Sequence, residues 1–227
     1  MNLTEIKTKT KQFWNWVWHS DSILSWLVAL IFIFIFVKFI FFPTLSLIMG
    51  TSLPLAGVES SSMDHKIVEN DYGILTLCDK TYLKKDKIII NFDEYWKNCG
   101  KWYEEREISK DEFLKFPIKN GFSKGDIIIV WGRFQPKLGD IIIFKPNKES
   151  EAPRPIIHRI IKIENGTIQT KGDHNPEQLK SSNNNYRTDE TSIKEEQIVG
   201  KAIFKIPYLG WFKIIVSDIL KKIFSLL

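Results

Sequence analysis

The sequence predicts a mainly β protein that one N-terminal transmembrane helix fixes to a membrane. Apolar residues of the 227-residue chain gather near its start, and the polar remainder carries short runs of β-branched residues. The dipeptide Asn165-Gly166 separates two of these runs. A long apolar segment is typical of a membrane span, and an Asn-Gly pair between strands is typical of a tight hairpin. We therefore expect an antiparallel β-rich domain behind a single helix.

Residues 1–22 are expected to be a cytosolic flank, and residues 23–42 a transmembrane helix. The flank has lysines followed by aromatic residues, which is the order expected at a cytosolic membrane surface: Lys7, Lys9, Lys11, Phe13, Trp14, Trp16 and Trp18. The next run is apolar except for Ser25 and Lys38, and about 20 such residues cross the hydrocarbon core. It exceeds the roughly 7 to 15 apolar residues of a cleaved signal peptide, so we expect it to be retained.

The apolar character continues to Val58, which leaves a second span over residues 39–58 as an alternative topology. Two prolines and two glycines interrupt this run: Pro43, Gly50, Pro54 and Gly57. They favour an extended path along the membrane over a regular helix. A single span is therefore expected, with residues 43–227 forming one domain outside the cytosol. A second span would return that domain to the cytosol.

The first part of this domain is expected to contain a strand over Tyr72–Leu77 and a helical insertion at about 79–122. Asp93 and Ser109 are suitable helix caps. The aromatic residues of the insertion are predicted to form its own small core, with a lid or a membrane contact as the alternative. Cys78 and Cys99 match no metal-binding spacing. They could pair outside the cytosol and would be free thiols inside it.

From Gly125 onward the pattern indicates strands. The runs Ile127–Val130 and Ile141–Phe144 each follow a Gly-Asp pair and are predicted to pair with each other. Strands are also expected on both sides of Asn165-Gly166 and, after a polar and mobile loop over 175–191, near the end of the chain: Ile156–Glu164, Thr167–Lys171 and Ile198–Ile206. Residues 211–227 alternate as an amphipathic helix, which would lie at the membrane interface, on the domain or against a partner helix.

Candidate chemistry centres on Ser62, which follows the apolar run. A serine hydroxyl is a poor nucleophile unless a positioned base takes its proton. The chain has four histidines, and His158 lies in an otherwise apolar strand, where a rigid element can hold its ring. Asp173 follows the second hairpin strand, and antiparallel pairing is expected to bring it back toward His158. A carboxylate there could orient the ring and stabilise the imidazolium.

Two alternatives to this assignment of the acid remain. Asp189 could support His158, although it lies at the far end of a polar loop whose ordering costs about 1 to 2 kcal/mol of conformational entropy per residue. Asp173 could also serve only to close a turn, because aspartate often accepts backbone N–H groups in loops.

Several segments, in this order, resemble the successive boxes of type I signal peptidases. They are Gly50–Val58, Ser60–Met63, Gly139–Phe144, Ile157–Ile160, Thr170–Asn175 and Pro207–Trp211. Bacterial members have a lysine before the arginine of the fourth segment. This chain has His158 before Arg159, which resembles the archaeal and endoplasmic-reticulum branch that uses Ser, His and Asp.

The resemblance implies a membrane-anchored serine endopeptidase that removes signal peptides from secreted preproteins, cutting after small residues at −1 and −3. It implies Ser62 as nucleophile, His158 as general base, and the Ser60 hydroxyl with the Ser62 backbone N–H as oxyanion donors. It requires no metal or cofactor. The location implied is the cell membrane, or the endoplasmic-reticulum membrane of a eukaryote.

Two positions depart from the family pattern. Asp64 is not followed by proline, and Leu179 stands where a further aspartate is common. A rival hypothesis is a non-catalytic, membrane-tethered β-domain that binds a partner protein, with its serines in a linker. The net charge of +5 is interspersed with acidic residues, so no basic stripe for nucleic acid is expected. Preproteins and anionic lipid are the expected partners, and accessory subunits remain open.

Overall fold

The computed structural model describes residues 2–70, 72–83, 91–147, 154–182, 188–212 and 214–215. It divides the chain into two units, Met1–Ile48 and Met49–Leu227; we call the second unit the β-domain. The helix expected over 211–227 lies for the most part outside the described residues.

The first unit is helical. Helix α1 (Leu3–His19) precedes a continuous helical segment made of α2 (Ile23–Phe36), the π-helical turn η1 (Val37–Phe41) and α3 (Phe42–Met49). Phe13 and Trp14 of α1 pack against Phe32 of α2, with ring centroids 6.1 and 5.3 Å apart. Among the described residues, Ile23–Met49 is the one helix long and apolar enough to cross a membrane.

This helix continues seven residues beyond the end that we expected at Phe42. Pro43 lacks an N–H group, and in a regular α-helix its ring would also clash with the carbonyl four residues earlier. Here the π-helical turn directly precedes it. Such a local adjustment of the hydrogen-bond pattern lets a membrane helix accommodate proline. Residues 43–49 therefore extend the helix instead of following an extended path.

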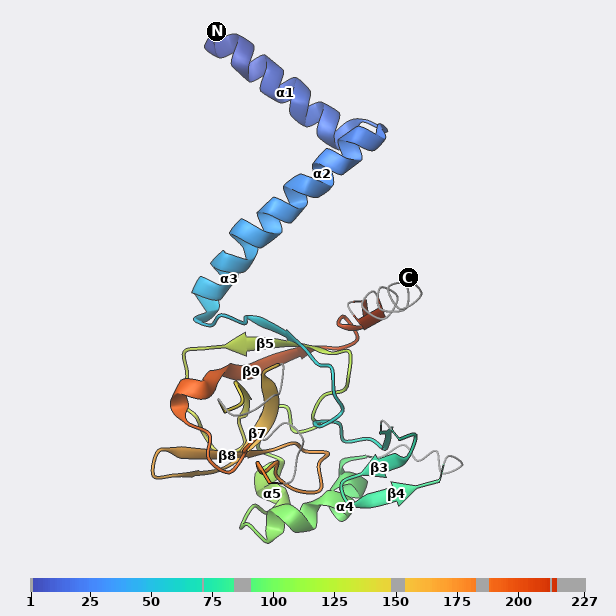
Figure 1. Ribbon diagram of the computed structural model, residues 1–227, viewed down its shortest axis with the longest axis vertical. Coiled ribbons are helices and arrows are strands. Elements are labelled where there is room, and N and C mark those ends of the chain that lie inside the picture. Colours follow the sequence, from blue (N-terminus) through green and yellow to red (C-terminus); the bar gives the residue numbers. More distant parts are fainter. Residues whose placement is uncertain are drawn as a thin grey trace. The chain divides into compact units, whose positions relative to one another are not determined.

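The β-domain is built on a six-stranded antiparallel sheet (Figure 1). Its strands, in spatial order, are β1 (Leu55–Gly57), β5 (Ile127–Trp131), β9 (Ile198–Ile206), β6 (Ile141–Phe144), β7 (Ile156–Glu164) and β8 (Thr167–Lys171). Buried apolar side chains cover both faces. Ile141 and Ile143 belong to one cluster, and Ile142 and Phe144 to another, because successive side chains of a strand point to opposite faces. The expected antiparallel β-rich fold is confirmed.

The expected pairing of β5 with β6 is wrong, because β9 lies between them and pairs with both. The connection 132–140 is longer than the roughly two to five residues of a hairpin loop, so it can pass over an intervening strand. The hairpin of β7 and β8 is confirmed. Asn165 and Gly166 have φ values of 49° and 75°, as a tight turn with two left-handed residues requires.

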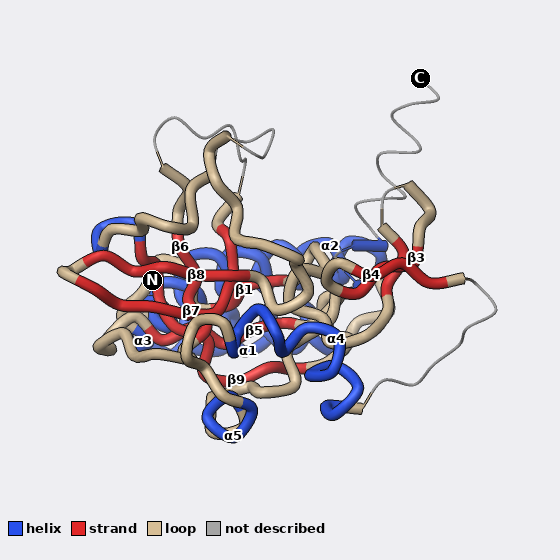
Figure 2. Tube along the Cα trace, turned by 90° about the horizontal axis from the view of Figure 1, so that it is seen from below, coloured by secondary structure: helices blue, strands red, loops and turns tan. Residues whose placement is uncertain are grey.

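The helical insertion packs beside a small three-stranded sheet (Figure 2). This sheet consists of β2 (Val68–Glu69), β3 (Leu75–Leu77) and β4 (Lys80–Tyr82). The helices of the insertion are α4 (Phe92–Glu104) and α5 (Lys110–Phe113). Outside the insertion, a short 3₁₀ turn, η2 (Glu195–Gln197), precedes β9. Ser109 caps α5 as expected, accepting from the Glu112 N–H at 3.2 Å. Asn91 caps α4, so Asp93 lies within the first turn rather than at the cap.

The aromatic residues of the insertion form a buried cluster, as expected. Tyr95, Tyr103 and Phe113 are fully buried and pack together with Ile161 of β7. Cys78, in the turn after β3, forms a disulfide with Cys99 of α4. The insertion is thus attached to the domain by a shared apolar core and by a covalent link.

Removing this disulfide should destabilise the β-domain. The two cysteines are 21 residues apart, and a cross-link of that span restricts the unfolded chain by about 3 kcal/mol. We expect the full chain with Cys78→Ala and Cys99→Ala, in detergent, to lose about this much free energy of unfolding in a urea titration. The matched control is the parent in reducing agent, which should unfold like the variant. Both unfolding like the oxidised parent would contradict the prediction.

Candidate active site

Ser62 and His158 line the same cavity of the β-domain. Its volume is about 500 Å³, and its walls come from β1, the segment that leads to Ser62, and the start of β7. Much of the lining is apolar: Leu53, Leu55, Ala56, Val58, Phe122, Ile143, Pro155, Ile156, Ile157 and Leu179. A serine and a histidine therefore line one largely apolar hollow, and such a composition is common for small binding sites.

Backbone hydrogen bonds hold the segment around Ser62. The Ser62 carbonyl accepts from His174 N at 2.9 Å, and the Met63 carbonyl accepts from Phe122 N at 3.1 Å. Met63 is buried in the domain core. The half-buried Ser62 hydroxyl lies 3.2 Å from the Ser60 hydroxyl. The serine is thus fixed on both sides, with a second hydroxyl beside it.

His158 is placed by the sheet. It lies in β7 opposite Ile142 of β6, and only 2% of it is exposed. Its Nδ1 bonds directly to the Glu190 carboxylate. A Cβ atom on Gly172 would lie 2.7 Å from both His158 Nε2 and the Ser62 carbonyl oxygen, so only glycine fits there. His158 Nε2 and the Ser62 carbonyl oxygen therefore both lie close to Gly172.

Sequence reasoning did not consider Glu190, yet its carboxylate is the one that meets His158. The side chain is fully buried. Its Oε1 accepts from the Thr170 hydroxyl at 2.8 Å, and its Oε2 accepts from Leu179 N at 2.8 Å. The one local feature that could have indicated this residue is its position shortly before Ile193, a single apolar residue at the end of a polar segment.

Asp173 is not brought to His158. It accepts from Arg159 Nη2 at 2.7 Å, from His65 Nε2 at 2.9 Å and from the Tyr103 hydroxyl at 3.1 Å. Sheet pairing does return this part of the chain to β7, with Lys171 opposite Arg159. His158 and Arg159 are neighbours in one strand, however, and neighbouring side chains point to opposite faces. Asp173 lies on the Arg159 face.

Asp189, the alternative acid, bonds within its own turn. Its carboxylate accepts from the backbone N–H and the hydroxyl of Thr191, at 2.8 and 2.6 Å. Neither aspartate forms a hydrogen bond with His158 in the described part of the chain.

Charge around Asp173 is closely balanced. Burial raises the pKa of Asp173, but the Arg159 guanidinium and the hydrogen bonds from His65 and Arg159 outweigh it and hold that pKa well below its usual range. Burial lowers the pKa of His65 despite the adjacent Asp173 carboxylate. Neutral His65 can donate from Nε2 to Asp173, while its ring stacks on Tyr95 with centroids 3.7 Å apart.

Lys171, at the end of β8, is a buried lysine. Burial lowers its pKa to about 8 despite the nearby carboxylates. Its Nζ donates to the Gly172 carbonyl at 3.0 Å and lies over the rings of Trp102 and Tyr103. It does not line the cavity that contains Ser62.

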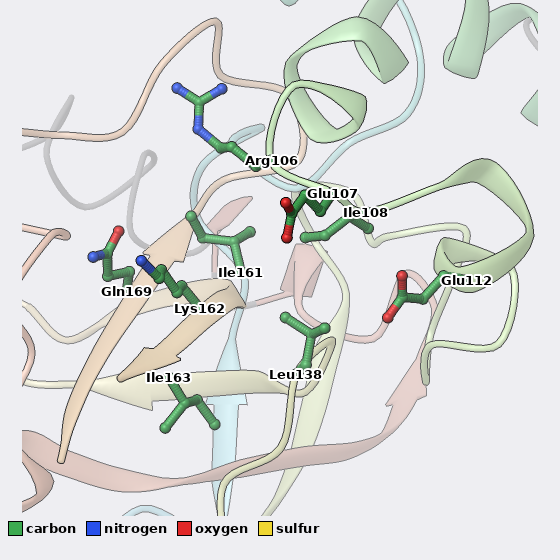
Figure 3. Close-up of a pocket in the computed structure, with 9 residues that line it drawn as sticks. All are labelled: Arg106, Glu107, Ile108, Glu112, Leu138, Ile161, Lys162, Ile163 and Gln169. Carbon is green, nitrogen blue, oxygen red and sulfur yellow. The ribbon is translucent and has the colours of Figure 1, made fainter. Parts of the chain in front are cut away.

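A second cavity, of about 610 Å³, lies between the insertion and the β7–β8 hairpin (Figure 3). Arg106, Glu107 and Glu112 come from the insertion, and Lys162 and Gln169 from the hairpin. Figure 3 shows these polar side chains spread around the hollow. None of its lining residues is a predicted site residue, so the site remains with Ser62 and His158.

Asp173→Asn should destabilise the protein strongly. It would leave the fully buried Arg159 without its counter-charge, and breaking one side of a buried ion pair costs about 3 to 5 kcal/mol. We expect that loss in the free energy of unfolding, measured by urea titration of the full chain in detergent. Asp189→Asn is the matched control and should cost less than about 1 kcal/mol, because its bonds are local. Equal stability of the two variants would refute the structural role of Asp173.

No family model matches the chain, but individual proteins do. The signal peptidase complex catalytic subunit SEC11 of Candida albicans is 30% identical over 111 residues, which are 46% of this chain and 63% of the relative. The subunit SEC11C of Homo sapiens is 32% identical over 121 residues, 50% of this chain and 60% of the relative. The subunit SEC11 of Leptosphaeria maculans is 26% identical over 112 residues, 46% of this chain and 61% of the relative.

The chain thus spans less than two thirds of the length of these relatives. All three relatives are catalytic subunits of the signal peptidase complex, and the order of motifs around Ser62 and His158 is consistent with this similarity. The chain is therefore similar to the catalytic subunits of signal peptidase, in agreement with the resemblance of its motifs to the type I family.

Proposed function

We propose that the protein is a membrane-anchored serine endopeptidase that removes signal peptides from secreted preproteins. The observation that carries the proposal is the cavity that Ser62 and His158 line together. A serine near an imidazole whose second nitrogen bonds a carboxylate is the arrangement of nucleophilic acyl transfer. The names of the relatives support the same reaction and the same class of substrate.

In this mechanism the Ser62 hydroxyl attacks the carbonyl carbon of the scissile peptide bond, and His158 Nε2 takes the hydroxyl proton. His158 then gives the proton to the departing amine, and the signal peptide stays as an ester on Ser62. Water, deprotonated by the same imidazole, hydrolyses the ester and restores the serine. The Ser62 N–H and the Ser60 hydroxyl donate to the oxyanion; Ser60 Oγ is only 3.2 Å from Ser62 Oγ.

The cavity also supports a preference for extended chains with small side chains. Strand β1, part of the wall, is at the edge of the sheet, and an extended peptide can bind along such an edge by backbone hydrogen bonds. The apolar lining would accept small residues at −1 and −3.

The helix Ile23–Met49 supports membrane anchoring, with the N-terminus cytosolic and the β-domain outside the cytosol. The Cys78–Cys99 disulfide supports this orientation, because disulfides persist in oxidising compartments. The location proposed is the cell membrane or the endoplasmic-reticulum membrane. Preproteins and lipid are the proposed partners, and the relatives' names suggest accessory subunits.

Ser62→Ala and His158→Ala should each abolish cleavage. Removing one member of such a catalytic unit costs roughly 10³-fold or more in kcat. The measurement is cleavage of a preprotein by purified full-length protein in detergent, followed by electrophoresis. Ser61→Ala is the matched control and should cleave like the parent. A Ser62→Ala variant as active as the parent would favour the non-catalytic, partner-binding hypothesis.

The orientation can be tested by limited proteolysis of sealed vesicles of known sidedness. Trypsin added on the extracytoplasmic side should cut the polar segment 175–191, which contains the exposed Lys180. It should leave Lys7, Lys9 and Lys11 intact until detergent opens the vesicles. Protection of the polar segment together with cleavage at these lysines would reverse the proposed topology.

A further inference from the structure

We infer that Glu190 is the positioning residue for His158: its carboxylate accepts the Nδ1–H of the imidazole and thereby directs Nε2 toward Ser62. This inference rests on the proposed peptidase function and assigns a role within that same site.

The first support is the contact itself. His158 Nδ1 and Glu190 Oε1 bond directly, and the two side chains are 3% and 0% exposed. An ionised carboxylate offers only acceptors, so the proton of the neutral ring must be on Nδ1. Nε2 is then the nitrogen able to take a proton from Ser62. Burial excludes water, which could otherwise compete for Nδ1.

The second support is that Glu190 is itself rigidly held. Its carboxylate receives the Thr170 hydroxyl and the Leu179 N–H, both at 2.8 Å. Its backbone N–H donates to the Leu179 carbonyl at 2.8 Å, and its carbonyl accepts from Thr170 N at 3.0 Å. Three donors therefore surround the carboxylate, and its backbone is paired on both sides. A side chain positioned in this way can set the direction of its partner's ring.

The third support is the charge around the carboxylate. Within the described residues, the one ion pair that Glu190 forms is with His158, whereas Asp173 is already paired with Arg159. During catalysis His158 becomes an imidazolium. The interaction of this buried carboxylate with the ring is more favourable when the ring is charged than when it is neutral. Glu190 thus stabilises the transition state more than the resting state, which is what accelerates a reaction.

Asp173 cannot take this role without a large rearrangement. Its carboxylate is shared among Arg159, His65 and Tyr103 on the opposite face of β7. Each residue of the pair His158 and Arg159 consequently has an acid of its own, one from each face of the strand.

The test compares Glu190→Gln, Glu190→Asp and the matched control Asp189→Asn in the full chain, in detergent. We expect Glu190→Gln to lower kcat by roughly 10³- to 10⁴-fold, as loss of an orienting carboxylate does in serine peptidases. KM should change little, because the ring acts on chemistry rather than on substrate binding. Glu190→Asp keeps the charge and should recover part of the loss. Asp189→Asn should keep the parental kcat.

A second readout does not depend on activity. In protein labelled with ¹⁵N-histidine, the His158 Nδ1–H proton should resonate far downfield in the parent, assigned by its absence from His158→Ala. It should move upfield in Glu190→Gln and stay in place in Asp189→Asn. If Glu190→Gln does not fold, Glu190→Asp and Thr170→Val take its place, and both should lower kcat and shift the same resonance.

The inference is overturned if Glu190→Gln keeps kcat within a few-fold of the parent and leaves the resonance unmoved. It is also overturned if a folded Asp173→Asn variant loses both kcat and the resonance while Glu190→Gln loses neither. Failure of the proposed function gives a different result, in which the parent does not cleave or Ser62→Ala cleaves equally. The resonance still decides the role of Glu190 in that case.

Discussion

The buried ion pair between Arg159 and Asp173 connects the segments that build the site. Both side chains are fully buried. Besides Asp173, the guanidinium donates to three carbonyls, two at the end of the insertion and one before β6, at 2.9 to 3.1 Å: Pro117, Ile118 and Gly139. The Asp173 carboxylate also accepts a hydrogen bond from the Tyr103 hydroxyl of α4. The backbone N–H of the next residue, His174, donates to the Ser62 carbonyl. The insertion, the sheet and the serine segment therefore depend on one charge pair.

This arrangement separates structure from chemistry across a single strand. Arg159 points to the face of β7 where the insertion packs, and His158 to the face that lines the cavity. Because alternation along a strand is strict, the same hydrogen bonds of β7 that fix the buried arginine also fix the imidazole. The strand that places the His158 ring is thus also held by Arg159, a neighbour that takes no part in the proposed reaction. An error of one residue in the register would exchange the two environments.

Local patterns in the sequence predicted what local interactions determine. The Asn165-Gly166 hairpin and the strand Ile198–Ile206 occur with the expected bounds, and Ser62 lies with His158 in one cavity. The placement of β9 between β5 and β6 depends on pairing between distant segments, which no local pattern encodes. The contact expected between Asp173 and His158 is absent although β7 and β8 pair as predicted. Asp173 lies on the face of β7 to which Arg159 points, and His158 points to the other face.

Glu190 escaped prediction because its order comes from tertiary contacts. Ordering a polar segment costs conformational entropy of about 1 to 2 kcal/mol per residue, and this cost argues against an acid at the far end of such a segment. In the structure, the end of that segment around Glu190 is paired to the sheet. Ile193 forms a bridge with Ile168 through two backbone bonds of 2.9 and 3.0 Å, and Glu190 pairs with Thr170.

These bonds make the stretch 190–193 a short extension of the sheet beside β8. Each contributes about 1 kcal/mol net, and the bonds to the Glu190 carboxylate contribute more because an ion accepts them. Together they are comparable to the ordering cost of so few residues. An acid that looks mobile in the sequence is therefore held by the same sheet that holds His158. The geometry between His158 and Glu190 is then set by backbone pairing on both sides.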